Sequence, residues 1–122
     1  FDLTKLVPML EAVHDRLAPV HIERLPYAKF IARYDRPGAL FYLDPPYDGC
    51  EDDYGPGVFS PADFDTLRGL LSNLKGRFVL SINATPKIRA MFDGFAIEEV
   101  AVTYQIGMAT TSAKELIISG GG

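Results

Sequence analysis

Residues 39–47 read ALFYLDPPY, and this segment decides how the rest of the sequence is interpreted. Its first five residues form a continuous apolar run, which is typical of a β-strand covered on both faces of a parallel sheet. The run ends at Asp44, Pro45 and Pro46, because neither proline has the backbone N–H that a sheet ladder needs. The sequence therefore predicts a buried strand whose carboxyl end leads into an acidic, rigid turn and an aromatic residue, Tyr47.

Upstream of this strand, the hydrophobic spacing predicts two helices and one short strand. Residues 20–23 alternate as a short strand does, and Pro26 suits the first position of a helix. That helix carries one apolar face formed by Tyr27, Phe30, Ile31 and Tyr34. An earlier amphipathic helix, whose start depends on how Pro8 is accommodated, has its apolar residues mostly three and four apart: Leu3, Leu6, Val7, Leu10, Val13 and Leu17.

Downstream, residues 48–59 contain three glycines, one proline and four acidic residues, which predicts a mobile surface loop. Ser60, Pro61 and Asp63 are typical of a helix start, and Gly76 is expected to stop that helix. The buried apolar face of this helix is predicted to consist of Phe64, Leu67, Leu70, Leu71 and Leu74. The remaining chain predicts a strand at 77–82, a helix at 85–92, a strand at 95–104 that is irregular at Glu98 and Glu99, a loop at 105–114 and a strand at 115–119.

This order of elements predicts an α/β fold. Strands that alternate with helices form parallel sheets with helical crossovers, and the last two strands, without a helix between them, suggest an antiparallel pair. We therefore expect the rear half of a doubly wound, mostly parallel, Rossmann-like sheet that ends in an antiparallel strand pair.

The composition restricts the class of protein. The chain has 122 residues, which suits one domain, and its net charge of −4 disfavours a surface that grips nucleic acid by charge alone. No apolar run is long enough to span a bilayer, no signal-peptide pattern is present, and Cys50 is the single cysteine. We expect a cytoplasmic protein, and the two histidines lack partners at metal-ligand spacing.

The residues after the strand suit a pocket for an aromatic amine, which is a poor nucleophile because its lone pair is shared with the ring. The Asp44 carboxylate and the Pro45 carbonyl can accept the two amine hydrogens, which localises the lone pair on nitrogen. Pro46 holds that carbonyl rigidly because φ is fixed at both prolines. Tyr47 offers a face on which a base can stack. The alternative is a rigid turn in which Asp44 caps backbone groups and Tyr47 fills space.

Residues 41–47, FYLDPPY, resemble the catalytic motif of the Dam-like adenine-specific DNA methyltransferases of phage and restriction–modification systems. Residues 31–38 resemble the end of the helix and the turn that lead to the motif in that family, whereas residues 78–83 and 115–118 resemble its next strand and its last strand. The resemblance implies methyl transfer from S-adenosylmethionine to adenine in double-stranded DNA. The target base would be flipped into a pocket formed by the catalytic residues Asp44, Pro45, Pro46 and Tyr47, and no metal is needed.

For the cofactor, the resemblance implies that Asp44 lies beside the methyl donor and that Tyr27 lies near its adenine, although Tyr27 also suits a core position. The family's glycine-rich cofactor loop and its target-recognition segment are absent from the sequence. Residues 1–122 are therefore expected to be the C-terminal, motif-carrying portion of one methyltransferase domain, with an exposed sheet edge that favours dimerisation. An amine methyltransferase acting on RNA or a protein amide, and an inactive fragment, remain alternatives.

Overall fold

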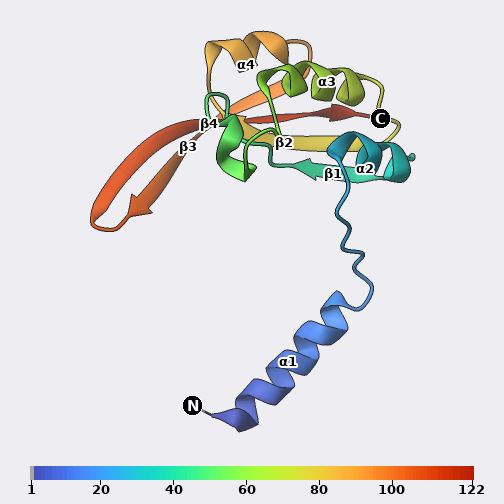
Figure 1. Cartoon of the computed structure of the whole chain (residues 1–122), viewed down its shortest axis with the longest axis vertical. Coiled ribbons are helices and arrows are strands. Elements are labelled where there is room, and N and C mark those ends of the chain that lie inside the picture. The colour runs from blue at the N-terminus through green and yellow to red at the C-terminus, as the bar shows by residue number, and fades with distance from the viewer. Residues whose placement is uncertain (1) are drawn as a thin grey trace.

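The computed structural model describes residues 2–122, which form an α/β fold with helices packed on one face of a four-stranded sheet (Figure 1). The elements, in chain order, are α1 (Leu3–Leu17), α2 (Tyr27–Tyr34), β1 (Leu40–Leu43), the short 3-10 helix η1 (Glu51–Tyr54), α3 (Pro61–Ser72), β2 (Arg77–Asn83), α4 (Pro86–Met91), β3 (Ala96–Ile106) and β4 (Ala109–Gly121). None of the helices within residues 2–122 combines the length and the apolar composition needed to cross a membrane.

The sheet is mixed, with the strand order β1-β2-β4-β3. β1 and β2 are parallel, with Leu43 opposite Leu80, and α3 forms the crossover between them. β4 is antiparallel to both of its neighbours, β2 and β3. The predicted antiparallel pair at the end of the chain is thus confirmed, and its second strand lies between β2 and β3.

The core lies between one face of the sheet and the helices α2, α3 and α4. Because side chains alternate across a strand, β2 and β4 each direct every second residue into this core. The predicted apolar face of α3 is confirmed at Phe64, Leu67 and Leu71, which are at most 3% exposed. The buried sheet residues are Phe41, Phe78, Leu80, Ile82, Leu116 and Ile118.

β1 is an edge strand in this structure, covered on one face. Phe41 is 6% exposed, whereas Leu40 and Tyr42, which point to the opposite face, are each 70% exposed. The prediction of a strand covered on both faces is therefore wrong within residues 2–122. A continuous apolar run shows that both faces of a strand are apolar, but it does not show which element covers them.

The predicted loop at residues 105–114 is wrong, because β3 and β4 form a long hairpin there. Pairing continues to Ile106 opposite Ala109, and Gly107 takes the positive φ of 62° that the tight turn requires. β3 is also regular at Glu98 and Glu99, which pair in register with β4. Each strand supplies the other with backbone partners, so this weakly hydrophobic segment forms a ribbon despite its loop-like composition.

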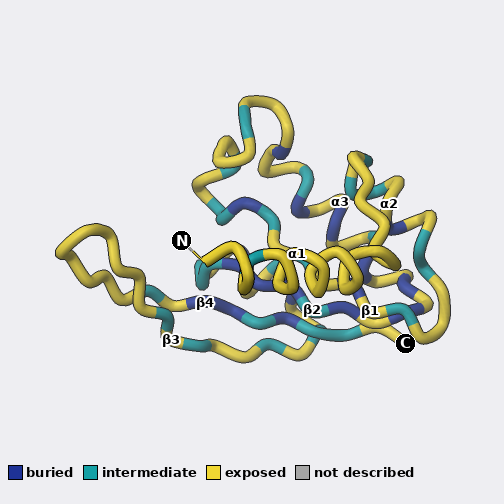
Figure 2. Tube along the Cα trace, turned by 90° about the horizontal axis from the view of Figure 1, so that it is seen from below, coloured by how far each residue is buried: buried dark blue, intermediate teal, exposed yellow. Residues whose placement is uncertain are grey.

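The predicted first helix is confirmed as α1, but it does not join the core. It begins at Leu3, with Asp2 accepting the Thr4 N–H, and continues through Pro8. None of its residues is buried (Figure 2), and it projects away from the sheet (Figure 1). The strand predicted at residues 20–23 is wrong: the chain there runs without regular secondary structure, because it has no neighbouring strand with which to pair.

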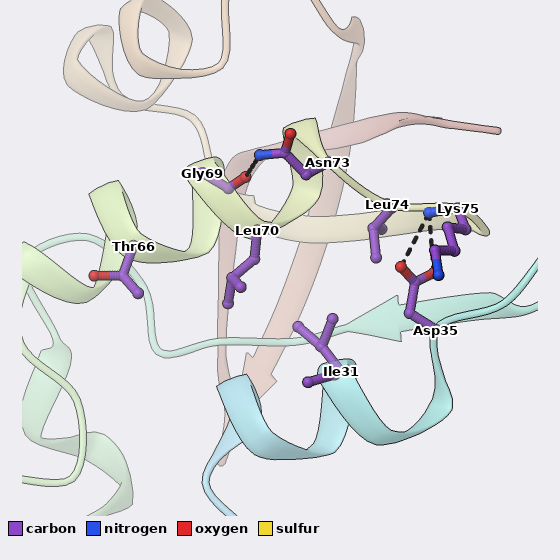
Figure 3. A pocket seen from close by; sticks show the side chains of 9 residues that line it. Ile31, Asp35, Thr66, Gly69, Leu70, Asn73, Leu74 and Lys75 are labelled. Atoms are coloured by element: carbon purple, nitrogen blue, oxygen red, sulfur yellow. Dashed lines mark hydrogen bonds between the residues drawn. The ribbon is translucent and has the colours of Figure 1, made fainter.

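The connection from α3 to β2 is anchored by Asp35, the residue that follows α2. Its carboxylate accepts the N–H group of Lys75, at 3.0 and 3.1 Å (Figure 3), and that of Gly76, at 2.9 Å. These bonds, first those of Lys75 and then that of Gly76, lower the pKa of Asp35. The hollow beside them, about 460 Å³ between α2 and α3, contains none of the motif residues.

Gly76 was expected to stop α3, but that helix ends at Ser72 with Asn73 as its C-cap. A Cβ atom at position 76 would lie 2.6 Å from the carbonyl oxygen of Ala39. Glycine is required there because β1 and β2 begin so close together that no side chain fits.

Candidate active site

The motif lies at the carboxyl end of β1, as the sequence predicts. β1 ends at Leu43, and Asp44, Pro45, Pro46 and Tyr47 follow it without an intervening residue. The parallel neighbour β2 ends at the same edge, at Asn83. Open α/β sheets bind ligands at this edge, where the loops after neighbouring strands diverge.

Two hollows meet at the motif, and Asp44, Pro45 and Pro46 line both of them. The larger, here called the Tyr27 hollow, has a volume of about 490 Å³ and is also lined by Tyr27 and Phe59. The smaller, here called the Tyr47 hollow, has a volume of about 230 Å³ and also includes Tyr47 and Asp53. The structure thus brings Tyr27 and the motif together, although Asp44 lies 17 positions after Tyr27 in the sequence.

Tyr27 is held by the start of α3. Its hydroxyl donates to Asp63 at 2.6 Å, and its ring lies 5.9 Å from the ring of Phe59. Burial, followed by the bond to Asp63, raises the pKa of Tyr27 to about 12, so the phenol stays protonated at neutral pH. The same bond, followed by the N–H of Ser60, lowers the pKa of Asp63. The predicted helix start at Ser60 and Asp63 is confirmed, and it also fixes Tyr27.

Tyr54 is a candidate site residue whose sequence context indicated only a surface loop. It lies at the end of η1, lines both hollows, and donates its hydroxyl to the carbonyl oxygen of Asp44 at 3.1 Å. The signal that could have found it is a large aromatic residue within an otherwise small and polar loop.

The chain that leaves the motif is attached to β2 and α4 through Asp48. Its N–H donates to Asn83 Oδ1 at 2.8 Å, and the Asn83 amide donates back to the Asp48 carbonyl at 3.0 Å. The Asp48 carboxylate accepts from Thr85 Oγ1 at 2.8 Å and from Lys87 Nζ at 3.2 Å. Four contacts therefore determine where the loop begins, one residue after Tyr47.

Tyr47 itself is bonded to the β3–β4 hairpin. Its hydroxyl lies 2.5 Å from the hydroxyl of Tyr104, which in turn donates to Glu115 Oε1 at 2.7 Å. Ser81 Oγ lies 3.4 Å from the other oxygen of Glu115, whose side chain is buried. From the sequence, Glu115 was predicted only as the first residue of a strand. The signal that could have identified it is an acidic residue directly before an apolar strand.

The family model for D12 class N6 adenine-specific DNA methyltransferases matches residues 3–106. The chain belongs to this family. The similarity to Dam-like adenine-specific DNA methyltransferases that the motif and its flanks indicated is confirmed, and the matched residues include β1, both hollows and Tyr104.

A viral relative, the Type II methyltransferase M.CviBI of Paramecium bursaria Chlorella virus NC1A, is 31% identical to this chain over 72 residues. The aligned region covers 59% of this D12-class chain and 28% of the viral protein. The chain therefore spans less than a third of the length of this relative.

Proposed function

We propose that this chain forms the target-amine pocket of an enzyme that transfers a methyl group from S-adenosylmethionine to the N6 amine of adenine in DNA. The observation that carries the proposal is the position of Asp44, Pro45 and Pro46 between two hollows. A methyl donor on one side of these residues and an acceptor base on the other can reach the same carboxylate. Membership of the adenine-specific family supports adenine as that acceptor.

The Tyr27 hollow fits the cofactor. Its aromatic walls, Tyr27 and Phe59, suit the flat adenine of S-adenosylmethionine, and the Asp44 carboxylate suits its cationic sulfonium. When bound, the cofactor would supply an electrophilic methyl group, and the electrons of the broken S–CH3 bond would stay on its sulfur as a neutral thioether. Because the Tyr27 hydroxyl is protonated and committed to Asp63, this residue offers its ring, rather than a charge, to the ligand.

The Tyr47 hollow fits the target base, which reaches it by flipping out of the duplex. The ring of Tyr47 stacks on the base, while the Asp44 carboxylate and the Pro45 carbonyl accept the two hydrogens of the amine. The nitrogen lone pair is then directed at the methyl group. After transfer, the nitrogen releases one of these hydrogens as a proton, and the Asp44 carboxylate can take it because a carboxylate is more basic than the Pro45 carbonyl.

The chain is the C-terminal, motif-carrying portion of a methyltransferase domain under this proposal. Three features support it: β1 is an edge strand, its residues Leu40 and Tyr42 expose an apolar face, and none of the apolar residues of α1 is buried. Additional strands beside β1, with helices on the open face, would complete a doubly wound sheet and cover these residues. The Type II relative suggests a restriction–modification setting.

The test uses the full polypeptide that carries residues 1–122, with S-adenosylmethionine labelled in its methyl group. Duplex DNA, RNA and protein are offered as acceptors, and the modified DNA is digested to nucleosides to identify N6-methyladenine. Asp44→Ala is expected to lower the rate of methylation at least about 100-fold, because the acceptor for the amine is lost. Asp52→Ala, which removes an exposed carboxylate from the neighbouring loop, should leave it unchanged.

Each other outcome contradicts the proposal. Normal methylation by Asp44→Ala would exclude the role of Asp44 as the amine acceptor. Transfer only to RNA or to a protein amide would replace adenine in DNA as the substrate, and no transfer to any acceptor would identify an inactive remnant.

A further inference from the structure

We infer that Tyr104 and Glu115 are positioning residues that orient the ring of Tyr47 for the target base. The inference rests on the proposed function, since it assigns the means by which the stacking residue is held. The contact joins parts of the chain that are far apart in sequence: Tyr104 is on β3, Glu115 is on β4, and Tyr47 follows β1.

The hydrogen bonds in this contact have a defined direction. A carboxylate only accepts, and a phenol has one hydrogen to donate. Because the hydrogen of Tyr104 is given to Glu115 Oε1, the oxygen of Tyr104 can only accept from Tyr47, at 2.5 Å. The Tyr47 hydroxyl therefore points away from the motif toward the hairpin, and its single hydrogen is used there.

Glu115 is a fixed end for this chain of hydrogen bonds. It is 9% exposed and lies where β4 is paired on both sides, opposite Asn83 of β2 and Val100 of β3. Its carboxylate is thus attached to the most extensively paired strand of the sheet, whereas Tyr104 lies further along the hairpin, where β4 is no longer paired with β2.

The partners of Glu115 indicate a role other than stability. Buried carboxylates are commonly paired with a cation, because burial of an isolated charge is costly. Among residues 2–122, no lysine or arginine forms an ion pair with Glu115, and its hydrogen-bond donors are the hydroxyls of Tyr104 and Ser81. For the stability of the sheet alone, a leucine at position 115 would serve at least as well as a glutamate. We therefore attribute the carboxylate to its hydrogen bond with Tyr104, which it orients.

The consequence for Tyr47 is a restricted ring. The consecutive prolines before it fix the backbone, and the hydroxyl bond fixes the far end of the side chain. With both ends held, the ring face is presented to the Tyr47 hollow before any base arrives. A ring that is already oriented loses less conformational freedom on binding than a free one.

The experiment is a double-mutant cycle in the full polypeptide. Tyr47→Phe and Tyr104→Phe each remove a hydroxyl and keep the ring. Each is expected to raise the KM for duplex DNA about fivefold, which corresponds to the net free energy of one hydrogen bond. Little change is expected in kcat or in the affinity for S-adenosylmethionine. The double variant should show the same loss as either single variant, since all three lack the same bond. Tyr34→Phe, on α2, is the control and should match the parent.

A second pair of variants separates positioning from folding. Glu115→Gln keeps a carbonyl oxygen that can accept from Tyr104, so it should retain most of the DNA affinity that Glu115→Ala loses. The fluorescence of 2-aminopurine at the target position should fall in Glu115→Ala together with the DNA affinity, because the flipped base is captured less firmly. The two glutamate variants are compared at a temperature at which both are folded by circular dichroism.

The inference fails if the effects of Tyr47→Phe and Tyr104→Phe multiply, or if Tyr104→Phe binds the duplex as the parent does. It also fails if Glu115→Gln and Glu115→Ala are equally impaired. These results would be obtained with a parent that methylates adenine, so they differ from failure of the proposed function, in which the parent itself does not methylate adenine.

Discussion

Replacement of Asn83 by alanine tests whether the end of β2 holds the motif loop. The Asn83 side chain accepts the Asp48 N–H at 2.8 Å and donates to the Asp48 carbonyl at 3.0 Å, and both bonds are partly buried. One hydrogen bond contributes about 1 kcal/mol net, so Asn83→Ala should lower the free energy of unfolding by about 2 kcal/mol. For a domain of this size, that corresponds to a fall in Tm of roughly 8 °C.

The measurement is urea denaturation of the 122-residue chain, followed by circular dichroism. Asn73→Ala is a matched control, since the Asn73 amide donates one exposed hydrogen bond to the Gly69 carbonyl (Figure 3). It should change the unfolding free energy by less than about 0.5 kcal/mol. If Asn83→Ala were no more costly than this control, the two bonds to Asp48 would not hold the loop.

Two further predictions concern the stability of the same chain. Gly76→Ala places a Cβ atom 2.6 Å from the Ala39 carbonyl oxygen and should destabilise the fold by about 1–3 kcal/mol. The control is Gly69→Ala, which has open space around it and should be neutral or stabilising. Equal unfolding free energies of the two variants would refute the close approach at Gly76. Folding lowers the pKa values of Asp35 and Asp63, so the folded chain binds fewer protons than the unfolded chain. The contribution of these two carboxylates to the free energy of unfolding is therefore present above pH 3.8 and lost as the pH falls below it. Urea titrations should therefore show a deficit for Asp63→Asn at pH 7 that narrows at pH 3, and a constant deficit would contradict this sign.

The motif is held at its exit by two different parts of the sheet. Asp48 is bonded to the end of β2 and the start of α4, and the Tyr47 hydroxyl is bonded to the β3–β4 hairpin. A loop that begins with two rigid prolines and is then anchored this closely can present the same geometry in every molecule. Preorganisation of this kind favours catalysis, because no rearrangement is needed when the substrate binds.

Local sequence signals correctly predicted most of the helices and most of the strands. The apolar stripe from Phe64 to Leu71 and the start at Ser60 predicted α3, and the run after Arg77 predicted β2. These signals succeeded because spacing and capping act within one or two turns of the chain. Predictions at residues 20–23 and 105–114 failed because strand formation depends on a neighbouring strand, and a short segment does not show whether one is present.

The motif residues were identifiable from sequence because they are consecutive and their chemistry is unusual. The partners that hold them were not, because Tyr54, Asn83, Tyr104 and Glu115 are ordinary residues at scattered positions. Only the order β1-β2-β4-β3 brings the ends of these strands and their loops to one edge of the sheet.

The sequence by itself therefore determined the position of the motif, the family, and the alternation of helices and strands, since each is encoded by residues near one another in the chain. The tertiary structure alone decided that β4 lies between β2 and β3, that β1 has one face open, and that Tyr47 is bonded to Tyr104 and through it to Glu115. The physical reason is range: propensity, capping and hydrophobic periodicity act over a few residues, whereas strand order, burial and side-chain contacts depend on segments that meet only after the chain has folded.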